Sequence, residues 1–370
     1  MKIGIVSTHA WPIPNPARTG DIYVLDLAIA LQAAGHDVTM FSPEGTQFSN
    51  VRHIPCAHGK YPPSSIECES KAYDLHKHEL ATMDIVHDVT QSKLVAHYVN
   101  KHGGKTCCTI NGGPWREPMY QPPNLIVQSK AQRERILRGA TDYENTPTPD
   151  LGGPPGIKVA DAHVVYDGID TDFYCPSDYA KDDHVLWLNR WHPTKGYALA
   201  IEFAKAHPGI KLLIAGESPA NETSDYQRQC AIDAARLALG APNISFQWLP
   251  GDPEHNIVKR ELYRRAIALI YTTQFQEPFG LSQVEAMACG TPVIATRFGS
   301  IPEIINHGVT GHICTQDADI LGRIADGVKW ARDAAIGPTI RAEAVARFDK
   351  AVMAQNYLAE YEAIVGGASW

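Results

Sequence analysis

Two glutamates, Glu277 and Glu285, are the residues of this sequence best suited to carry chemistry. They enclose a Pro-Phe-Gly turn and the expected start of a helix at about Leu281. The first N–H groups of a helix lack partners within it, and its dipole is positive there, so this end suits a phosphate. An ionised carboxylate instead accepts hydrogen bonds from neighbouring hydroxyls. The stretch predicts a ligand with phosphate and sugar, although singly Glu285 could complement the dipole and Glu277 could be a solvated loop residue.

A second pair of charged residues lies in the same half of the chain. Arg190 follows the apolar run HVLWLN, and Lys195 precedes a helical pattern that opens near Gly196. Two cations and a helix N-terminus at the end of a strand suit a diphosphate. Each cation alone would more often be a solvated loop charge. Two phosphate-type features at the carboxyl ends of strands together favour a binding site.

These residues belong to a chain in which short apolar runs alternate with segments of helical spacing. Repeated strand–helix–strand units imply parallel sheets with helices on both faces, and two such series imply two doubly wound, Rossmann-like domains. We expect a first domain over residues 1–170 and a second over 171–349, with a polar linker at 170–183 and a C-terminal helix near 350–370. The expected strands are KIGIVST, HDVTMFS, MDIVHDV, KTCCTI, NLIVQS, HVLWLN, KLLIAG, ISFQW, IALIYTT and TPVIAT.

The composition restricts the class of protein. The 370 residues are 44% hydrophobic and 20% charged, which is ordinary for a globular protein of two or three domains. The net charge of −8 argues against general nucleic-acid or membrane-surface binding, and no apolar run approaches the length of a membrane span. The start MKIGIVSTHA reads as a strand and not as a signal peptide. The eight cysteines form no CxxC pair and predict free thiols in a reducing cytoplasm.

Other suggestive segments have structural interpretations. The segments 170–172 and 317–319 each spell D-x-D, a spacing that can bind a divalent metal, but a linker and a helix cap account for them. The histidine-containing run at 74–80 is expected to be a polar helix. The basic runs at 129–138 and 258–265 are expected to be solvated helix faces and not lipid or nucleic-acid contacts. We therefore expect no metal.

The segment EPFGLSQVEAMACGTPVIA resembles the E-x7-E motif of glycosyltransferase family 4, the retaining nucleotide-sugar enzymes of GT-B fold. Further segments are similar to other elements of that family, in the same order: VVYDGIDTDFYCP, LNRWHPTKG, FGSIPEIINHGVTG and RFDKAVMAQNYLAEYEAI. Together they span most of the chain. The resemblance implies two Rossmann-like domains facing a central cleft, with the C-terminal helix returning to the first domain.

The resemblance also implies a role for each residue of the site. The reaction would move a sugar from a UDP- or GDP-linked donor to an unidentified acceptor hydroxyl, with retention and without a metal or other cofactor. Peripheral contact with a membrane is left open, and so is the oligomeric state. Arg190 and Lys195 would hold the diphosphate, Glu285 would bind the ribose hydroxyls, and Glu277 would bind the transferred sugar. The backbone of Phe279, Gly280 and Leu281 would bind both sugar and phosphate. The base would lie near Trp248 and Leu249.

The first half of the sequence departs from the family pattern. The family commonly has D-x-x-H-x-H after a strand, but Val89 stands where the second histidine would be. His87 is the expected catalytic candidate, with Asp88 or His9 as substitutes and a structural strand-end histidine as the alternative interpretation.

The loops of the first half of the chain also lack residues of the family pattern. Only Gly20 remains of the usual paired glycines, although it suits a helix start near the diphosphate. Arg18 and the segment 110–115 are expected on the acceptor side, and Asp167 replaces a usual asparagine.

Three other functions stay open on sequence alone. A nucleotide-sugar 2-epimerase of similar architecture would need additional acid–base carboxylates, which the sequence does not reveal. A non-catalytic protein that binds sugar nucleotides would account for Val89 but not for the intact pair of glutamates. A glucosyltransferase acting on nucleic-acid bases would need a contiguous basic groove.

Overall fold

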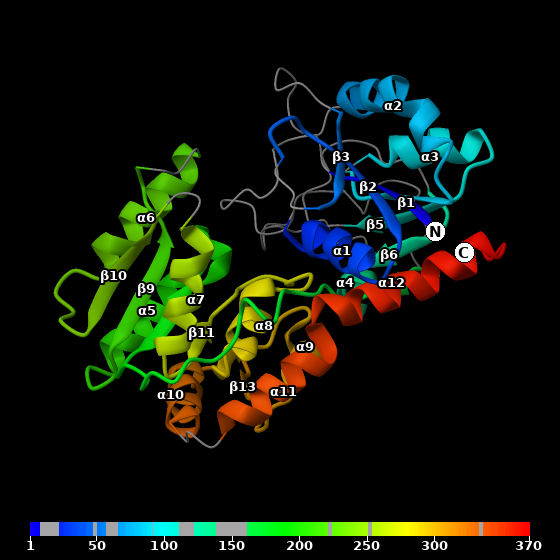
Figure 1. Ribbon diagram of the computed structural model, residues 1–370. Helices are drawn as coiled ribbons and strands as arrows, with labels where there is room; N and C mark the ends of the chain where they lie inside the picture. Colours follow the sequence, from blue (N-terminus) through cyan, green and yellow to red (C-terminus); the bar gives the residue numbers. More distant parts are fainter. Residues whose placement is uncertain are drawn as a thin grey trace. The chain divides into compact units, whose positions relative to one another are not determined.

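The protein forms two compact units, which Figure 1 shows in a computed structural model. Unit 1 comprises Met1–Gly168 and Lys350–Trp370, and unit 2 comprises Ile169–Asp349, so the expected linker at 170–183 lies in unit 2. Gly20, His9, Arg18 and residues 111–115 lie outside the described residues. The structure describes residues 1–7, 22–46, 50–56, 66–90, 92–110, 122–137, 161–220, 224–250, 254–332 and 336–370.

In the described residues, unit 1 is built on a seven-stranded parallel sheet in the order β3-β2-β1-β4-β5-β6-β7. The two edge strands, β3 and β7, were not predicted, because they are short and only partly buried and so lack the apolar runs of the inner strands. The strands are β1 (Lys2–Val6), β2 (Asp37–Ser42), β3 (Arg52–Pro55), β4 (Ile85–Asp88), β5 (Thr106–Ile110), β6 (Leu125–Val127) and β7 (His163–Val164). The helices are α1 (Ile22–Ala33), α2 (Ile66–Leu80), α3 (Leu94–Lys101), α4 (Lys130–Leu137) and α12 (Lys350–Val365).

The C-terminal helix α12 completes the core of unit 1. It packs beside α1, as Figure 1 shows, and its buried Tyr357 and Tyr361 join the apolar side chains of α1 and β1. A segment more than 300 residues distant in sequence therefore covers the first strands of the chain.

In the described residues, unit 2 is built on a six-stranded parallel sheet in the order β10-β9-β8-β11-β12-β13. The strand order reverses between β8 and β11, which is where open α/β sheets bind ligands at their carboxyl edge. The strands are β8 (Val185–Leu188), β9 (Leu212–Glu217), β10 (Ile244–Leu249), β11 (Leu269–Tyr271), β12 (Val293–Thr296) and β13 (Gly311–Cys314). The helices are η2 (Pro193–Lys195), α5 (Tyr197–Ala206), α6 (Asp225–Leu237), α7 (His255–Arg265), α8 (Leu281–Ala288), α9 (Ile301–Ile304), α10 (Ile320–Ala331) and α11 (Gly337–Phe348).

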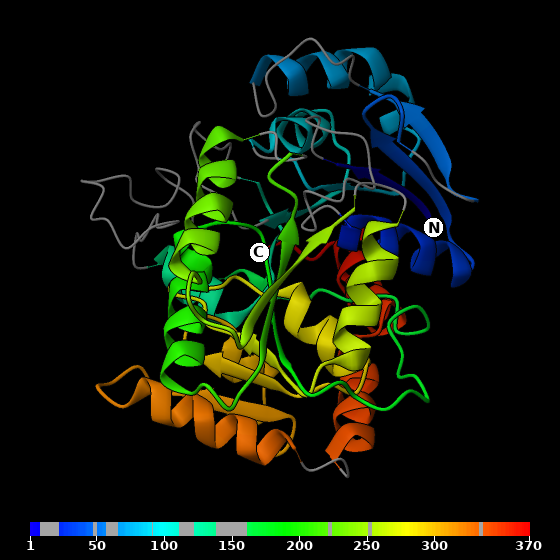
Figure 2. The same ribbon diagram turned by 90° about the vertical axis from the view of Figure 1, so that its left-hand side faces the viewer.

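Helices cover both faces of the second sheet (Figure 2). One face packs against α5, α6 and α10 through an apolar cluster of unit 2, and α7 and α8 contact strands β10, β11 and β12. The predicted fold class, two doubly wound Rossmann-like domains, is confirmed.

His87 is a core residue of unit 1, and its surroundings argue against the expected catalytic role. The side chain is fully buried, and its two ring nitrogens lie 2.8 Å from Thr109 Oγ1 and 2.8 Å from Tyr361 Oη. Burial, with the charge of Lys93 adding to it, lowers the pKa of His87 to about 3. A neutral imidazole with both nitrogens engaged has no capacity left for a substrate proton near neutral pH.

Asp88 and Val89 are also buried at this strand end. Asp88 accepts hydrogen bonds from the backbone N–H groups of Thr90 and Ala96, which fixes the start of α3. Asp88 therefore has a structural role of its own and is a poor substitute for the missing histidine.

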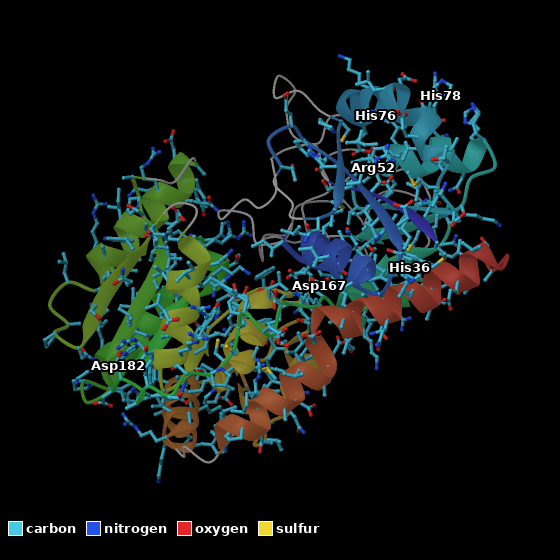
Figure 3. All side chains as sticks on the ribbon, viewed as in Figure 1. His36, Arg52, His76, His78, Asp167 and Asp182 are labelled. Atoms are coloured by element: carbon cyan, nitrogen blue, oxygen red, sulfur yellow. The ribbon has the colours of Figure 1, made fainter. Side chains whose placement is uncertain are left out.

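Asp167 gives unit 1 an expected pH dependence of stability. The residue, labelled in Figure 3, is 2% exposed. Gln128 Nε2 donates to its Oδ2 at 2.6 Å, while no partner in the described residues reaches Oδ1. Burial raises the pKa of Asp167 from 3.8 to about 7, and the bond from Gln128 opposes this shift. Between these two pKa values the folded state binds more protons than the unfolded state, so stability is lost as pH rises through about 7.

Asp167→Asn should therefore stabilise the protein more at pH 8 than at pH 5. A pKa difference of this size corresponds to at most roughly 4 kcal/mol. The measurement is the thermal midpoint of both proteins at the two pH values, with Asp178→Asn as the same change at an exposed position. An equal effect of Asp167→Asn at both pH values would contradict the buried carboxyl.

The suggestive metal motifs have structural partners. Figure 3 shows His76 and His78 on α2, where His76 Nε2 lies 3.0 Å from the carbonyl of Pro55. Asp317 pairs with Arg323 at 2.7 Å. In the described ranges, no three His, Cys, Asp or Glu side chains are grouped to hold a metal, and no helix is long and apolar enough to cross a membrane.

Candidate functional site

Lys195 and Glu277 meet at the point where the strand order of unit 2 reverses. Lys195 ends the short helix η2 after β8, and Glu277 lies in the loop after β11. Lys195 Nζ donates to Glu277 Oε2 at 2.6 Å, and the two side chains are 9% and 8% exposed. Residues 82 apart in sequence are thus joined by a buried ion pair.

The loops that carry these two residues are held together through their backbones. The N–H of Gln274 donates to the carbonyl of Thr194 at 2.6 Å, and Thr272 Oγ1 donates to the carbonyl of Gly196 at 2.8 Å. Gly196 has a φ of +74°, and a Cβ there would lie 1.7 Å from the carbonyl oxygen of Thr272. Only glycine permits this approach, so the Gly after Lys195 sets the distance between the loops.

Tyr271 is the second donor to Glu277. Its hydroxyl donates to the same Oε2 at 2.6 Å from the end of β11. Burial, and then the charge of Glu277, hold the pKa of Tyr271 well above its usual range, so the phenol stays protonated. In the described part of the chain no donor reaches Oε1 of Glu277. The carboxylate is therefore anchored through one oxygen and keeps the other for a ligand.

The electrostatics of Lys195 reflect its position. Burial lowers the pKa of its amine, Glu277 opposes the shift, and the charge of Arg190 adds to it. The ring of Phe275 lies 4.5 Å from Lys195 Nζ. Arg190 itself is exposed, and its charge acts on the pKa of both Lys195 and Tyr271, so the expected cation pair lies in one region.

Helix α8 begins at Leu281, as predicted, after Gly280 with a φ of +92°. The carbonyl of Phe279 accepts from Ser300 Oγ at 2.6 Å and from Gln283 Nε2 at 2.7 Å, and the Phe279 ring is buried. In the described residues no backbone acceptor reaches the N–H of Gly280 or Leu281. These two N–H groups are thus available to an anion at the positive end of the helix.

Glu285 is held differently from Glu277. Lys259 Nζ donates to its Oε1 at 2.8 Å, and Tyr263 Oη donates to its Oε2 at 2.9 Å. All three residues are at most 3% exposed. The expectation of a solvated basic face at 258–265 is therefore wrong for Lys259, which faces inward one helical turn before Tyr263.

The expected base region lies at the edge strand β10. Trp248 is 36% exposed, and its ring centre lies 5.8 Å from that of the buried Trp191, which directly follows Arg190. A Cβ at Gly216 would lie 2.7 Å from the Trp191 ring, so this glycine leaves room for the indole. Leu249 is buried and contributes no exposed side chain.

Sequence reasoning missed three residues of this site: Tyr271, Lys259 and Tyr263. Lys259 and Tyr263 are spaced by four, which places them on one helix face and could have marked an inward-facing pair. Tyr271 lies within the predicted strand IALIYTT and is the last residue of the observed strand β11, and nothing else in the sequence indicated that it belongs to the site.

The chain is similar to known proteins over the residues that form this site. The family model "Glycosyl transferases group 1" matches residues 177–331, a range within unit 2 that contains Arg190, Lys195, Glu277 and Glu285. A D-inositol 3-phosphate glycosyltransferase from Mycobacterium sp. (strain JLS) is 29% identical over 357 residues, covering 84% of this chain and 78% of the relative. A glycosyltransferase is the class of enzyme that these matches indicate.

Solved structures show the same architecture over the whole chain. Sucrose-phosphate synthase from Thermosynechococcus elongatus has a TM-score of 0.75 at 20% identity and covers 100% of both chains. HepE from Anabaena, solved in complex with UDP and glucose, has a TM-score of 0.69 at 19% identity, covering 98% of this chain and 100% of that chain. The chain thus has the GT-B fold of these structures.

Proposed function

We propose that this enzyme moves a sugar from a nucleotide-diphosphate sugar to an acceptor hydroxyl, with retention at the anomeric carbon and without a metal. One observation carries the proposal. Glu277 is fixed through Oε2 by Lys195 and Tyr271, keeps Oε1 for a ligand, and stands beside the open N-terminus of α8. A carboxylate for sugar hydroxyls thus adjoins donors for phosphate.

In this proposal, positive charge and backbone donors stabilise the leaving diphosphate. Arg190, Lys195 and the N–H groups of Gly280 and Leu281 would face the negative charge that develops as the sugar–phosphate bond breaks. These two cations would take the place of a divalent metal. Glu277 would orient the transferred sugar through its hydroxyls.

The nucleoside would lie between Glu285 and the edge strand β10. Both oxygens of Glu285 already hold a protein donor, yet each carboxylate oxygen accepts more than one hydrogen bond, so ribose hydroxyls can be added. Trp248 and Leu249 would bound the base. Membership of the retaining family 4 and a cytoplasmic location belong to the same proposal, and the free thiols of the described cysteines support the latter.

UDP-linked sugars are the first donors to test, because the Anabaena neighbour holds UDP and glucose. We expect UDP or UDP-glucose to raise the thermal midpoint, with or without EDTA, while GDP and GDP-mannose serve as the alternative series. A ligand at one hundred times its Kd adds about 2.7 kcal/mol of stability. If no nucleotide shifts the thermal midpoint, the proposal of a nucleotide-sugar donor is overturned. If the shift requires Mg²⁺, the proposal of metal independence is overturned.

Retention is tested separately from binding. Transfer to any accepted hydroxyl should give a product with the anomeric configuration of the donor, which nuclear magnetic resonance distinguishes. The comparisons do not favour an epimerase, since the matching family model and the mycobacterial relative are both named as glycosyltransferases. An epimerase would interconvert two nucleotide sugars in the absence of an acceptor, and the same spectra would reveal it.

A further inference from the structure

Each of the two glutamates is held by one lysine and one tyrosine, but in different ways. At Glu285 the two donors take one oxygen each. At Glu277 both Lys195 and Tyr271 bind the same oxygen, Oε2, each at 2.6 Å. Two donors on one oxygen restrain the carboxylate and leave Oε1 pointing away from both. Glu277 therefore has one oxygen without a donor in the described residues, whereas each oxygen of Glu285 has one.

We propose that Tyr271 is a positioning residue that keeps Glu277 directed at the transferred sugar while Lys195 is shared with the donor diphosphate. The inference rests on the proposed function. It assigns the two donors of Glu277 different tasks, one permanent and one exchangeable.

The chemistry of the two donors supports this division. The Lys195 ammonium carries three N–H groups, so it can bind Glu277 and an arriving phosphate together, at the cost of a weaker hold on the carboxylate. Tyr271 has a single O–H, and that group already donates to Glu277. Its ring is 1% exposed in β11, so the sheet fixes the direction of the hydroxyl. A diphosphate that competes for Lys195 therefore leaves the bond from Tyr271 intact.

Gly280 makes room for this arrangement. A Cβ at position 280 would lie 3.1 Å from Tyr271 Oη and 3.2 Å from Cγ of Glu277. The glycine at the start of α8 thus lets the phenol, the carboxylate and the helix N-terminus approach one another. The tyrosine belongs to the geometry of the site and not only to the core of the sheet.

The test is the variant Tyr271→Phe. Calorimetry measures its affinity for UDP and for UDP-glucose, and a transfer assay measures kcat. We expect the UDP affinity of the variant to stay within about twofold of the wild type. The ratio of UDP-glucose affinity to UDP affinity should fall about tenfold to one hundredfold, and so should kcat. This is the loss expected when a hydrogen bond to a charged group is removed. Equal weakening of both ligands, or an unchanged preference for UDP-glucose, would overturn the inference.

Tyr263→Phe is the matched control, because it removes an equally buried hydroxyl from the other glutamate. It should weaken UDP and UDP-glucose to the same extent and leave their ratio unchanged. If Tyr271→Phe does not fold, Tyr271→Met removes the hydroxyl with a flexible side chain and answers the same question.

A double variant shows whether Tyr271 acts through Glu277. In a Glu277→Gln background, Tyr271→Phe should lower the preference for UDP-glucose by less than about twofold further, because coupled residues are not additive. A full additional loss would show that the tyrosine acts independently. Failure of the proposed function is distinguished at the outset, since the wild-type enzyme would then bind neither the UDP nor the GDP series. An enzyme that prefers GDP is tested in the same way with GDP and GDP-mannose.

Discussion

Glu277→Gln is expected to lower sugar transfer at least about one hundredfold while the protein stays folded. Misdirection of a fixed polar group at a reacting centre commonly costs this much. Glutamine keeps an oxygen that can accept from Tyr271, but it removes the negative charge from the partner of Lys195. Because the substituted side chain has nearly the same volume, the loss should come from the site and not from the core.

The measurement is release of the nucleotide diphosphate at saturating donor and acceptor. Affinity for UDP alone should change only a few-fold, since Glu277 is assigned to the sugar and not to the nucleotide. Glu202→Gln is a suitable control, because Glu202 is an exposed residue on α5 of the same unit. Turnover of Glu277→Gln within threefold of the wild type would remove Glu277 from the proposed mechanism.

Lys259→Met is expected to destabilise unit 2 by about 3–5 kcal/mol, the usual cost of removing one partner of a buried ion pair. Glu285 would remain almost fully buried with only the hydroxyl of Tyr263 as a donor. The charge then lacks both water and a cation. The same variant should weaken nucleotide binding, because the direction of Glu285 depends on both donors.

Urea unfolding followed by tryptophan fluorescence measures this loss, since Trp187 and Trp191 lie in the core of unit 2. Lys205→Met, a change at an exposed lysine of α5, should have little effect. The double variant Lys259→Met/Glu285→Gln should recover a large part of the stability, because no unpaired charge remains. A loss below about 1 kcal/mol, or no recovery in the double variant, would contradict a buried Lys259–Glu285 pair.

The sequence by itself determined the features that depend on local pattern. The inner strands of both sheets were predictable, because a parallel strand buried on both faces is a continuous apolar run. The start of α8 at Leu281 was also predictable, since Gly280 precedes a helical pattern. The edge strands β3, β7 and β13 were not, because each has at most four residues and leaves no such run, whereas the six-residue edge strand β10 was predicted.

The positions of the two glutamates were equally visible in the sequence, but their surroundings were not. Lys195 binds Glu277 across 82 residues, and Lys259 binds Glu285 across 26, and no periodic pattern marks such pairs. Local sequence also does not show what surrounds His87. A histidine at the end of a strand has the same sequence pattern whether it faces a ligand or the core. Only the packing of α12 on the first sheet placed Tyr361 against His87, and that contact favours a structural role.

Charge gave the least reliable signal in the sequence. The basic run at 258–265 looks like a solvated helix face, yet Lys259 is 1% exposed because Glu285 on α8 lies opposite. Whether a lysine on a helix points to water or to a carboxylate depends on the neighbouring helix, which local sequence does not encode. Local sequence thus determined which residues could act, and the tertiary structure decided which of them meet, because burial and pairing depend on segments that are far apart in the chain.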